Sequence, residues 1–288
     1  MKKKHYLLLL LLTPIFMVHA QNDTLHWKKS LQTGLNLNQA SFSDNWKGGG
    51  VNSIALGTFL NATASYSDKK KITFDNDLQL AYGFVQNKGQ TARKSQDKIF
   101  FDSKLGYKIA KNWNLFASVN FSSQFDAGFE YKKDQAGAEY AILLSKFMAP
   151  GYLTSSIGLE YKPVDYFWAR FGTGTLRQTF VLDTALYQTN PKYYGLERGK
   201  KVRSEVAFQF IANFDKDIAT NLNLKTRFSA LAPYENIGRI VSRLDATLTA
   251  KVNKYINVNL TGTMLNDPDM DDKVQYSQGF ALGILFNM

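Results

Sequence analysis

Apolar side chains recur at every second position in twelve segments of the chain. The clearest segment is 72–84, where Ile72, Phe74 and Leu80 share one face while Asp75 and Gln79 share the other. A period of two indicates a β-strand, because successive side chains of a strand point to opposite faces. The other segments are 31–38, 54–66, 99–109, 115–125, 153–161, 167–179, 206–214, 222–228, 244–252, 256–264 and 275–288.

The last segment, 275–288, predicts how the sheet is completed. Phe280, Leu282 and Ile284 alternate there with mostly small residues. An unpaired apolar edge strand invites aggregation, and pairing it with the first strand removes the edge. The pattern therefore predicts an all-β fold, a transmembrane antiparallel β-barrel of about twelve strands.

The connections between these segments alternate strictly between short and long. The short ones are 67–70, 110–112, 162–165, 215–219 and 253–255, and the long ones are 41–50, 86–96, 126–152, 181–203, 232–239 and 266–275. Outer-membrane barrels have short periplasmic turns and longer external loops, so we expect both termini to be periplasmic. The connection 126–152 is long enough to fold inward and narrow the lumen.

One predicted strand, 167–179, contains two glycines that flank a threonine, Gly172 and Gly174. A glycine inside a strand usually marks a kink or a bulge. We therefore expect an irregularity of the strand at this point, and not a phosphate-binding loop.

The first twenty residues have the features of a secretory signal peptide. Lysines occupy positions 2–4, an apolar run covers 6–18, and Ala20 ends a small-residue cleavage site. We therefore expect a signal peptide over 1–20 and an outer-membrane barrel over 21–288, located in the cell outer membrane. A retained anchor helix is the alternative, but the apolar run is short for a membrane span.

Charge and cysteine content narrow the expected partners. The formal net charge is +11, but the basic residues are dispersed and form no stripe, so nucleic acid is not expected as a partner. The charge is better suited to anionic lipid and lipopolysaccharide headgroups. An exported barrel also needs the barrel assembly machinery during biogenesis, and an unidentified envelope protein is a further candidate partner. The chain has no cysteine, so neither disulfides nor thiolate metal sites hold the fold.

Three stretches resemble a known family. They are GLNLNQASFSDNWKGGG at 34–50, SKFMAPGYLT at 145–154 and LEYKP at 159–163. They are similar to a Bacteroidota outer-membrane β-barrel family classified as a domain of unknown function, and the resemblance spans nearly all of the chain after residue 20. It implies the same barrel and the cell envelope, and it implies no activity and no catalytic residues.

The number and position of the histidines argue against enzymatic activity. Of three histidines, His5 and His19 lie in the predicted signal peptide and His26 precedes the first strand. A Ser–His or carboxylate–His site in the barrel wall therefore has no histidine to use. We expect no enzymatic activity and no catalytic residues.

Two external-loop features have both a functional and a structural interpretation. The acidic loop with Asp267, Asp269, Asp271 and Asp272 has closely spaced carboxylates that suit Ca²⁺, although a solvated loop is the simpler interpretation. No other cofactor is expected. Trp46 lies beside three glycines and is either an aromatic platform for a ligand or an anchor in the external aromatic girdle. We expect Trp168 to anchor in the second girdle, at the periplasmic end.

The alternation also assigns a polar face to the barrel interior. Thirteen charged residues are predicted to line the lumen: Asp75, Asp77, Asp102, Lys104, Lys108, Glu160, Arg170, Glu205, Lys225, Arg227, Arg243, Asp245 and Lys251. Buried charges must pair or face water. If they face water, the barrel is a narrow, weakly selective channel for small polar solutes. If they pair, it is a closed barrel that serves as a structural or docking component of an envelope complex. Twelve strands is an intermediate width that fits both.

Overall fold

The computed structural model describes residues 26–41, 43, 51–188, 192–253 and 256–287. Within this part of the chain, twelve antiparallel strands close into one barrel in the order β1-β14-β13-β12-β11-β10-β9-β8-β5-β4-β3-β2. The predicted fold class is confirmed. The strands are β1 (Trp27–Ala40), β2 (Ser53–Ser67), β3 (Ile72–Asn87), β4 (Arg93–Lys108), β5 (Trp113–Ser123), β8 (Gly151–Val164), β9 (Phe167–Phe180), β10 (Val202–Ala219), β11 (Leu222–Pro233), β12 (Val241–Lys251), β13 (Ile256–Asn266) and β14 (Gln275–Asn287).

Closure depends on the pairing of the first strand with the last. Leu35 of β1 lies opposite Ile284 of β14, and Gln32 lies opposite Asn287. Every strand then has two neighbours, so the sheet has no free edge in the barrel wall. Both ends of the barrel sequence lie at the end that carries the short turns, because the backbone of His26 accepts a hydrogen bond from Ser67 at 2.8 Å.

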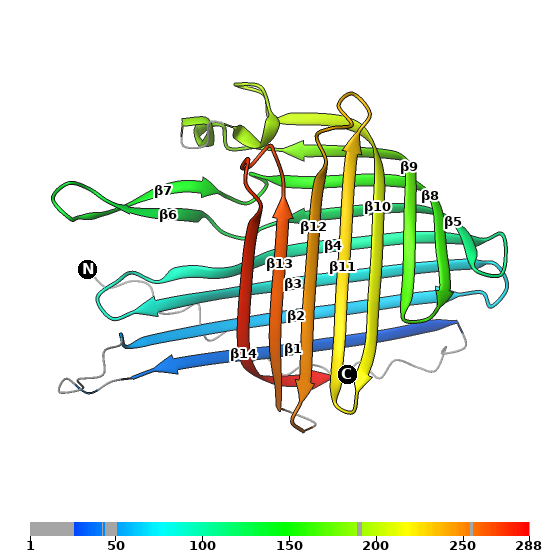
Figure 1. Ribbon diagram of the computed structural model, residues 1–288, viewed down its shortest axis with the longest axis horizontal. Coiled ribbons are helices and arrows are strands. Elements are labelled where there is room, and N and C mark those ends of the chain that lie inside the picture. The colour runs from blue at the N-terminus through cyan, green and yellow to red at the C-terminus, as the bar shows by residue number, and fades with distance from the viewer. Residues whose placement is uncertain (1–25, 42, 44–50, 189–191, 254–255, 288) are drawn as a thin grey trace, which may run out of the picture.

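Two walls of the barrel cross each other. In Figure 1, β1 to β5 run roughly horizontally behind β10 to β13, which run roughly vertically, and β8 and β9 turn the corner between them. The register shifts between β8 and β9 at Ile157/Gly158, where residues 172–174 form a bulge. A bulge bends a strand and increases its twist. The prediction that Gly172 and Gly174 mark an irregularity is therefore confirmed.

One long connection is shorter than predicted. β3 continues to Asn87 and β4 begins at Arg93, so only residues 88–92 connect them. The sequence pattern ends earlier because the added residues are polar. Lys94 pairs with Asp97 at 2.8 Å there, so polar side chains satisfy each other along the extended strand.

The longest connection contains a hairpin that the alternation did not predict. Strands β6 (Gly128–Lys133) and β7 (Glu139–Ser145) pair in a separate two-stranded sheet. In Figure 1 the hairpin extends away from the barrel end, so the expectation that this connection folds inward is wrong. Arg93 at the end of β4 pairs with Glu139 at 2.5 Å and tethers the hairpin to the wall.

The outward face of the strands is apolar. Leu105, Leu159, Leu260, Phe280 and Leu282 are all exposed on it. A soluble protein would bury such a continuous belt, whereas a lipid bilayer solvates it. Within the described residues, no helix has the length and apolar character needed to cross a membrane.

Candidate functional site in the barrel lumen

The strand register determines which side chains face the lumen. In β4, for example, Phe101 and Leu105 are exposed on the outward face, so Asp102 and Lys104 between them point inward. The same parity, followed around the barrel, places all thirteen sequence-predicted charged residues on the inward face. Lys108 and Lys251 lie at the short-turn ends of their strands and are exposed there.

Four of these residues form a buried ion-pair layer. Glu160 of β8 accepts hydrogen bonds from Lys104 at 2.8 Å and from Arg170 at 2.9 Å. Arg170 of β9 also donates to Asp102 at 3.1 Å. Glu160 is only 1 % exposed, and Lys104 and Arg170 are each 5 % exposed. Because two cations and two carboxylates satisfy one another, the layer links β4, β8 and β9 without an unpaired buried charge.

A second cluster combines cations with aromatic rings. The guanidinium carbon of Arg170 lies 4.1 Å from the Trp168 ring centroid, and that of Arg227 lies 5.7 Å from the same ring. Trp168 therefore points into the lumen, and the expectation that it anchors in a lipid-facing girdle is wrong. Trp168 lies between Phe167 and Ala169, whose side chains face outward, so its own side chain faces inward. The ring is held by the two arginines, to which its π face is attractive.

The remaining predicted residues pair more locally. Arg243 and Asp245 form a bidentate pair at 2.7 Å for both contacts on β12. Lys225 approaches Asp215 more loosely, at 3.7 Å. Asp75 is a second partner of Lys104 at 3.1 Å, with 39 % of its side chain exposed. Asp77 accepts a hydrogen bond from Gln79 at 2.7 Å.

The opposite part of the lumen surface is different in character. On β2, β13 and β14, the inward-facing side chains of Thr63, Thr261 and Ser277 are exposed. In the middle of β2, the ring of Phe59 fills the space above Gly34, where a Cβ atom would meet it at 2.5 Å. The inward side of this wall therefore combines exposed hydroxyl side chains with one tightly packed point.

A folded loop cluster lies at the external end of the barrel. Its core consists of Ala149, Val181, Leu186, Tyr193, Tyr194 and Leu196, contributed in part by the 3₁₀ helices η2 (Thr184–Gln188) and η3 (Tyr193–Gly195). The Tyr194 hydroxyl donates to the carbonyl of Leu144 at 2.6 Å, joining the cluster to β7. A hydrogen bond from Lys146, 3.1 Å away, lowers the pKa of Asp183 in the same cluster.

The acidic loop is bound to basic side chains of β10 and of the connection between β11 and β12. Asp269 accepts from Arg203 at 2.9 Å and from Arg239 at 2.5 Å. Burial raises the pKa of Asp267 above its ordinary value, and Arg177, 3.8 Å away, opposes that rise. Glu205, which was predicted to line the lumen, also binds both Arg203 and Arg239.

Two external-loop predictions have different outcomes. Among the described residues, no three carboxylate, histidine or cysteine side chains converge as metal ligands. Asp271 bonds the backbone of Lys273 at 2.8 Å, and Asp272 pairs with Lys192 at 2.5 Å. Ca²⁺ binding by this loop stays a prediction. Trp46 lies outside the described residues, as does the predicted signal peptide.

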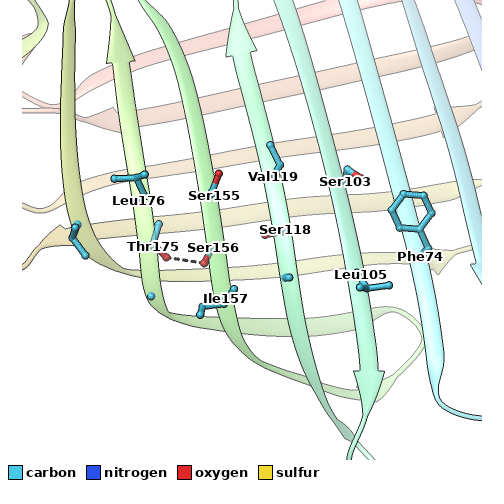
Figure 2. Close-up of a pocket in the computed structure, with 13 residues that line it drawn as sticks. Phe74, Ser103, Leu105, Ser118, Val119, Ser155, Ser156, Ile157, Thr175 and Leu176 are labelled. Atoms are coloured by element: carbon cyan, nitrogen blue, oxygen red, sulfur yellow. Dashed lines mark hydrogen bonds between the residues drawn. The ribbon is translucent and has the colours of Figure 1, made fainter.

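A hollow of about 510 Å³ lies on the outward face of the wall. Figure 2 shows it above small side chains, among them Ser103 and Ser155, with larger apolar side chains around it. The hydrogen bond between Ser156 and Thr175, 2.7 Å long, lies on the lumen side of the same strands. The hollow therefore belongs to the apolar outer surface and not to the lumen.

Sequence reasoning missed several lumen residues. Lys98 precedes the apolar pattern of the fourth strand and Phe100 lies within it. Both are an even number of residues from Asp102, so their side chains face the lumen as that of Asp102 does. Extending that parity backwards would have identified them. Arg177 lies inside the predicted strand 167–179, but the bulge at residues 172–174 shifts the inward parity there. Arg203 lies where β10 continues beyond the apolar pattern, and no local signal distinguishes it from a loop residue.

One family model is similar to part of the chain, and the comparisons leave activity open. Residues 37–129 match a family described as "Protein of unknown function (DUF3078)", which confirms the resemblance noted for the first stretch, whereas the stretches at 145–154 and 159–163 lie outside the match. The origin in Bacteroidota stays a prediction. No curated protein matches the chain in sequence.

Several solved barrels are similar to the chain at low identity. The translocator domain of the autotransporter NalP from Neisseria meningitidis has 9 % identity and a TM-score of 0.39, with 92 % of this chain and 90 % of that chain covered. The COG4313 outer membrane channel from Pseudomonas putida F1 has 9 % identity and a TM-score of 0.40, with coverages of 91 % and 94 %. The NanC porin has 7 % identity and a TM-score of 0.38, with coverages of 90 % and 99 %. At these values the similarities carry no functional argument, and the barrel architecture rests on the strand pairing itself.

Proposed function

We propose that this chain is an integral barrel of the bacterial outer membrane that acts as a narrow, weakly selective channel for small polar solutes. The apolar outward belt supports the membrane location, and the short turns are assigned to the periplasmic side. The chain ends of the barrel are then periplasmic too.

The observation that carries the channel proposal is the exposure of inward-facing hydroxyl side chains. Thr261 lies in the middle of β13 and Thr63 lies within β2, and both are exposed although they point into the barrel. A side chain in this position meets water only if water enters the lumen. Small polar residues on a wetted surface favour passage of small hydrophilic solutes.

Weak selectivity follows from the inventory of inward charges. Acidic and basic residues are present in nearly equal number among the thirteen, and most of them are paired. Of the further inward cations, Arg177 and Arg203 also have carboxylate partners, Asp267 and Asp269, which leaves Lys98 as the added charge. A lumen with little net charge discriminates poorly between simple cations and anions.

A closed barrel with a docking role is the second candidate, and two observations favour it. The ion-pair layer around Glu160 fills one side of the lumen, and the cluster around Tyr193 gives the external end a folded surface. In this case the long loops, and not the lumen, are the working surface.

Conductance of the folded protein in a planar lipid bilayer separates the two candidates. Discrete, reproducible current steps are the expected result. A silent membrane, with protein whose heat-sensitive gel mobility shows a folded barrel, would contradict the channel and leave the docking role.

A further inference from the structure

Arg227 is placed at the centre of the lumen between two walls. It projects inward from the middle of β11, opposite Asn213 of β10 and Asp245 of β12. Its guanidinium carbon lies 5.4 Å from the ring centroid of Phe100, which belongs to β4. In the barrel order, four strands separate β4 from β11 on the shorter side, so this contact crosses the lumen.

Within the described part of the chain, Arg227 forms no ion pair and no side-chain hydrogen bond. The acids that interact with it electrostatically are Asp77, Asp102 and Asp245. Each of these carboxylates is already bound by another residue. A guanidinium has five N–H donors in a fixed plane, so Arg227 has unused donors.

The arginines that already bind these carboxylates do so through short hydrogen bonds. Arg170 holds Asp102 at 3.1 Å, and Arg243 holds Asp245 with two contacts of 2.7 Å. These acids lower the electrostatic cost of placing Arg227 in the lumen without occupying its N–H groups. A lumen arginine that served only the structure would be expected to share one of these carboxylates.

Arg227 is not sealed inside the protein. Its side chain is half-buried, and none of its nitrogen atoms is among the fully enclosed polar atoms that lack a partner. The rings of Phe100 and Trp168, at 5.4 and 5.7 Å, hold the guanidinium within cation–π range. Such a guanidinium is pre-oriented, and its planar fork matches an oxyanion with two acceptor oxygens.

We propose that Arg227 is a binding site for the oxyanion group, carboxylate or phosphate, of a solute in the lumen. Lys98 adds a second positive charge nearby, with its ammonium 5.1 Å from the Phe100 ring and bonded to Gln79 at 2.7 Å. The role of the site in transport rests on the proposed channel, whereas binding itself does not require conduction. The guanidinium fork adds geometric recognition of two acceptor oxygens to the positive charge of the site, which separates an oxyanion from a simple anion.

Fluorescence of Trp168 provides a direct assay because this ring lies beside Arg227. The chain has four tryptophans, and replacing Trp27, Trp46 and Trp113 with Phe leaves Trp168 as the single reporter. The full barrel is folded in detergent and titrated with sodium acetate, sodium phosphate or sodium chloride at constant ionic strength. Gel mobility confirms that each variant is folded.

The test variant is Arg227→Gln and the matched control is Lys225→Gln. Lys225 lies two residues away on the same inward face but has a carboxylate partner, Asp215 at 3.7 Å. We expect a saturable response to acetate or phosphate in the parent protein and in the control. The affinity should fall by about tenfold or more in Arg227→Gln, since hydrogen bonds to charged groups are lost. The preferred anion identifies carboxylate or phosphate as the recognised group.

Some outcomes would overturn the site while leaving the channel untouched. These are no saturable response in the parent protein, an unchanged response in Arg227→Gln, or a response to chloride equal to that of both oxyanions. Conversely, Arg227-dependent binding by a barrel that is silent in bilayers would establish the site and reject the proposed channel.

Discussion

The wall formed by β4, β5, β8 and β9 differs from the wall formed by β13, β14, β1 and β2 in how its inward side chains meet water. In the first wall, Glu160 is 1 % exposed and Thr175 is fully buried. In the second, Thr63, Thr261 and Ser277 are exposed. The first wall also contains the bulge between β8 and β9, whereas the pairings of the second wall show no register shift.

This contrast indicates how one barrel could combine a packed interior wall with the proposed passage. Long ionisable side chains reach their partners on neighbouring strands and exclude water between them, as Lys104 and Arg170 do around Glu160. Short hydroxyl side chains do not reach across the lumen. The proposed passage is therefore placed off-centre, beside the packed wall and not through it.

The largest effect is expected from removing the centre of the ion-pair layer. Glu160→Ala leaves Lys104 and Arg170 buried without that carboxylate, and should lower the free energy of unfolding by about 3–5 kcal/mol. Urea unfolding of the barrel in lipid vesicles measures this change. Asp75→Ala removes a more exposed partner of the same lysine and should cost less than about 1 kcal/mol. Equal losses in the two variants would show that the wall is not held by this layer.

A smaller loss of stability is expected from overpacking the same wall. A Cβ atom on Gly158 would meet the carbonyl oxygen of Phe171 on β9, at the bulge where the wall bends. Gly158→Ala should therefore destabilise the barrel by about 1–3 kcal/mol. A Cβ atom added to Gly262 on β13 would have nothing within 4 Å, so Gly262→Ala should stay within about 0.5 kcal/mol of the parent protein.

The same unfolding assay measures both glycine variants. If Gly262→Ala proved the more damaging substitution, the assignment of tight packing to β8 and β9 would be wrong.

The smallest effect is expected in conductance when the open wall is filled. Thr261→Trp places a large ring in the proposed passage and should reduce single-channel conductance by about half or more, since a narrow lumen leaves little free cross-section. Leu260→Trp is the control, because Leu260 is the next residue on β13 and is exposed on the outward face. It should leave the conductance unchanged. A similar reduction in both variants would argue against a passage along β13.

The sequence predicts the barrel strands well because their pattern is local. The lipid-facing side selects apolar residues at every second position, and all twelve wall strands follow that rule. The hairpin β6–β7 escapes prediction because β6 is only six residues long, so Phe129 and Tyr131 alternate with Glu130 and Lys132 over too few positions to stand out. The extensions of β3 and β4 escape because their added residues are polar.

The lumen is only partly predictable. Parity alone identifies which charges point inward, because that depends on position in a strand. Which charges pair depends on neighbours that are distant in sequence: Arg170 and Asp102 are 68 residues apart. The unused donors of Arg227 and the inward position of Trp168 likewise depend on strand register and are not visible in any single segment.

Accessibility of single cysteines tests the central claim most directly, since the chain has no cysteine of its own. Thr261→Cys and Thr175→Cys place a thiol on the inward face of the open wall and of the packed wall, respectively. With a charged methanethiosulfonate reagent added during bilayer recording, Thr261→Cys should react quickly and reduce the current, whereas Thr175→Cys should not react. Equal reaction of both thiols, or faster reaction at position 175, would contradict a water-filled passage confined to the β13, β14, β1 and β2 wall.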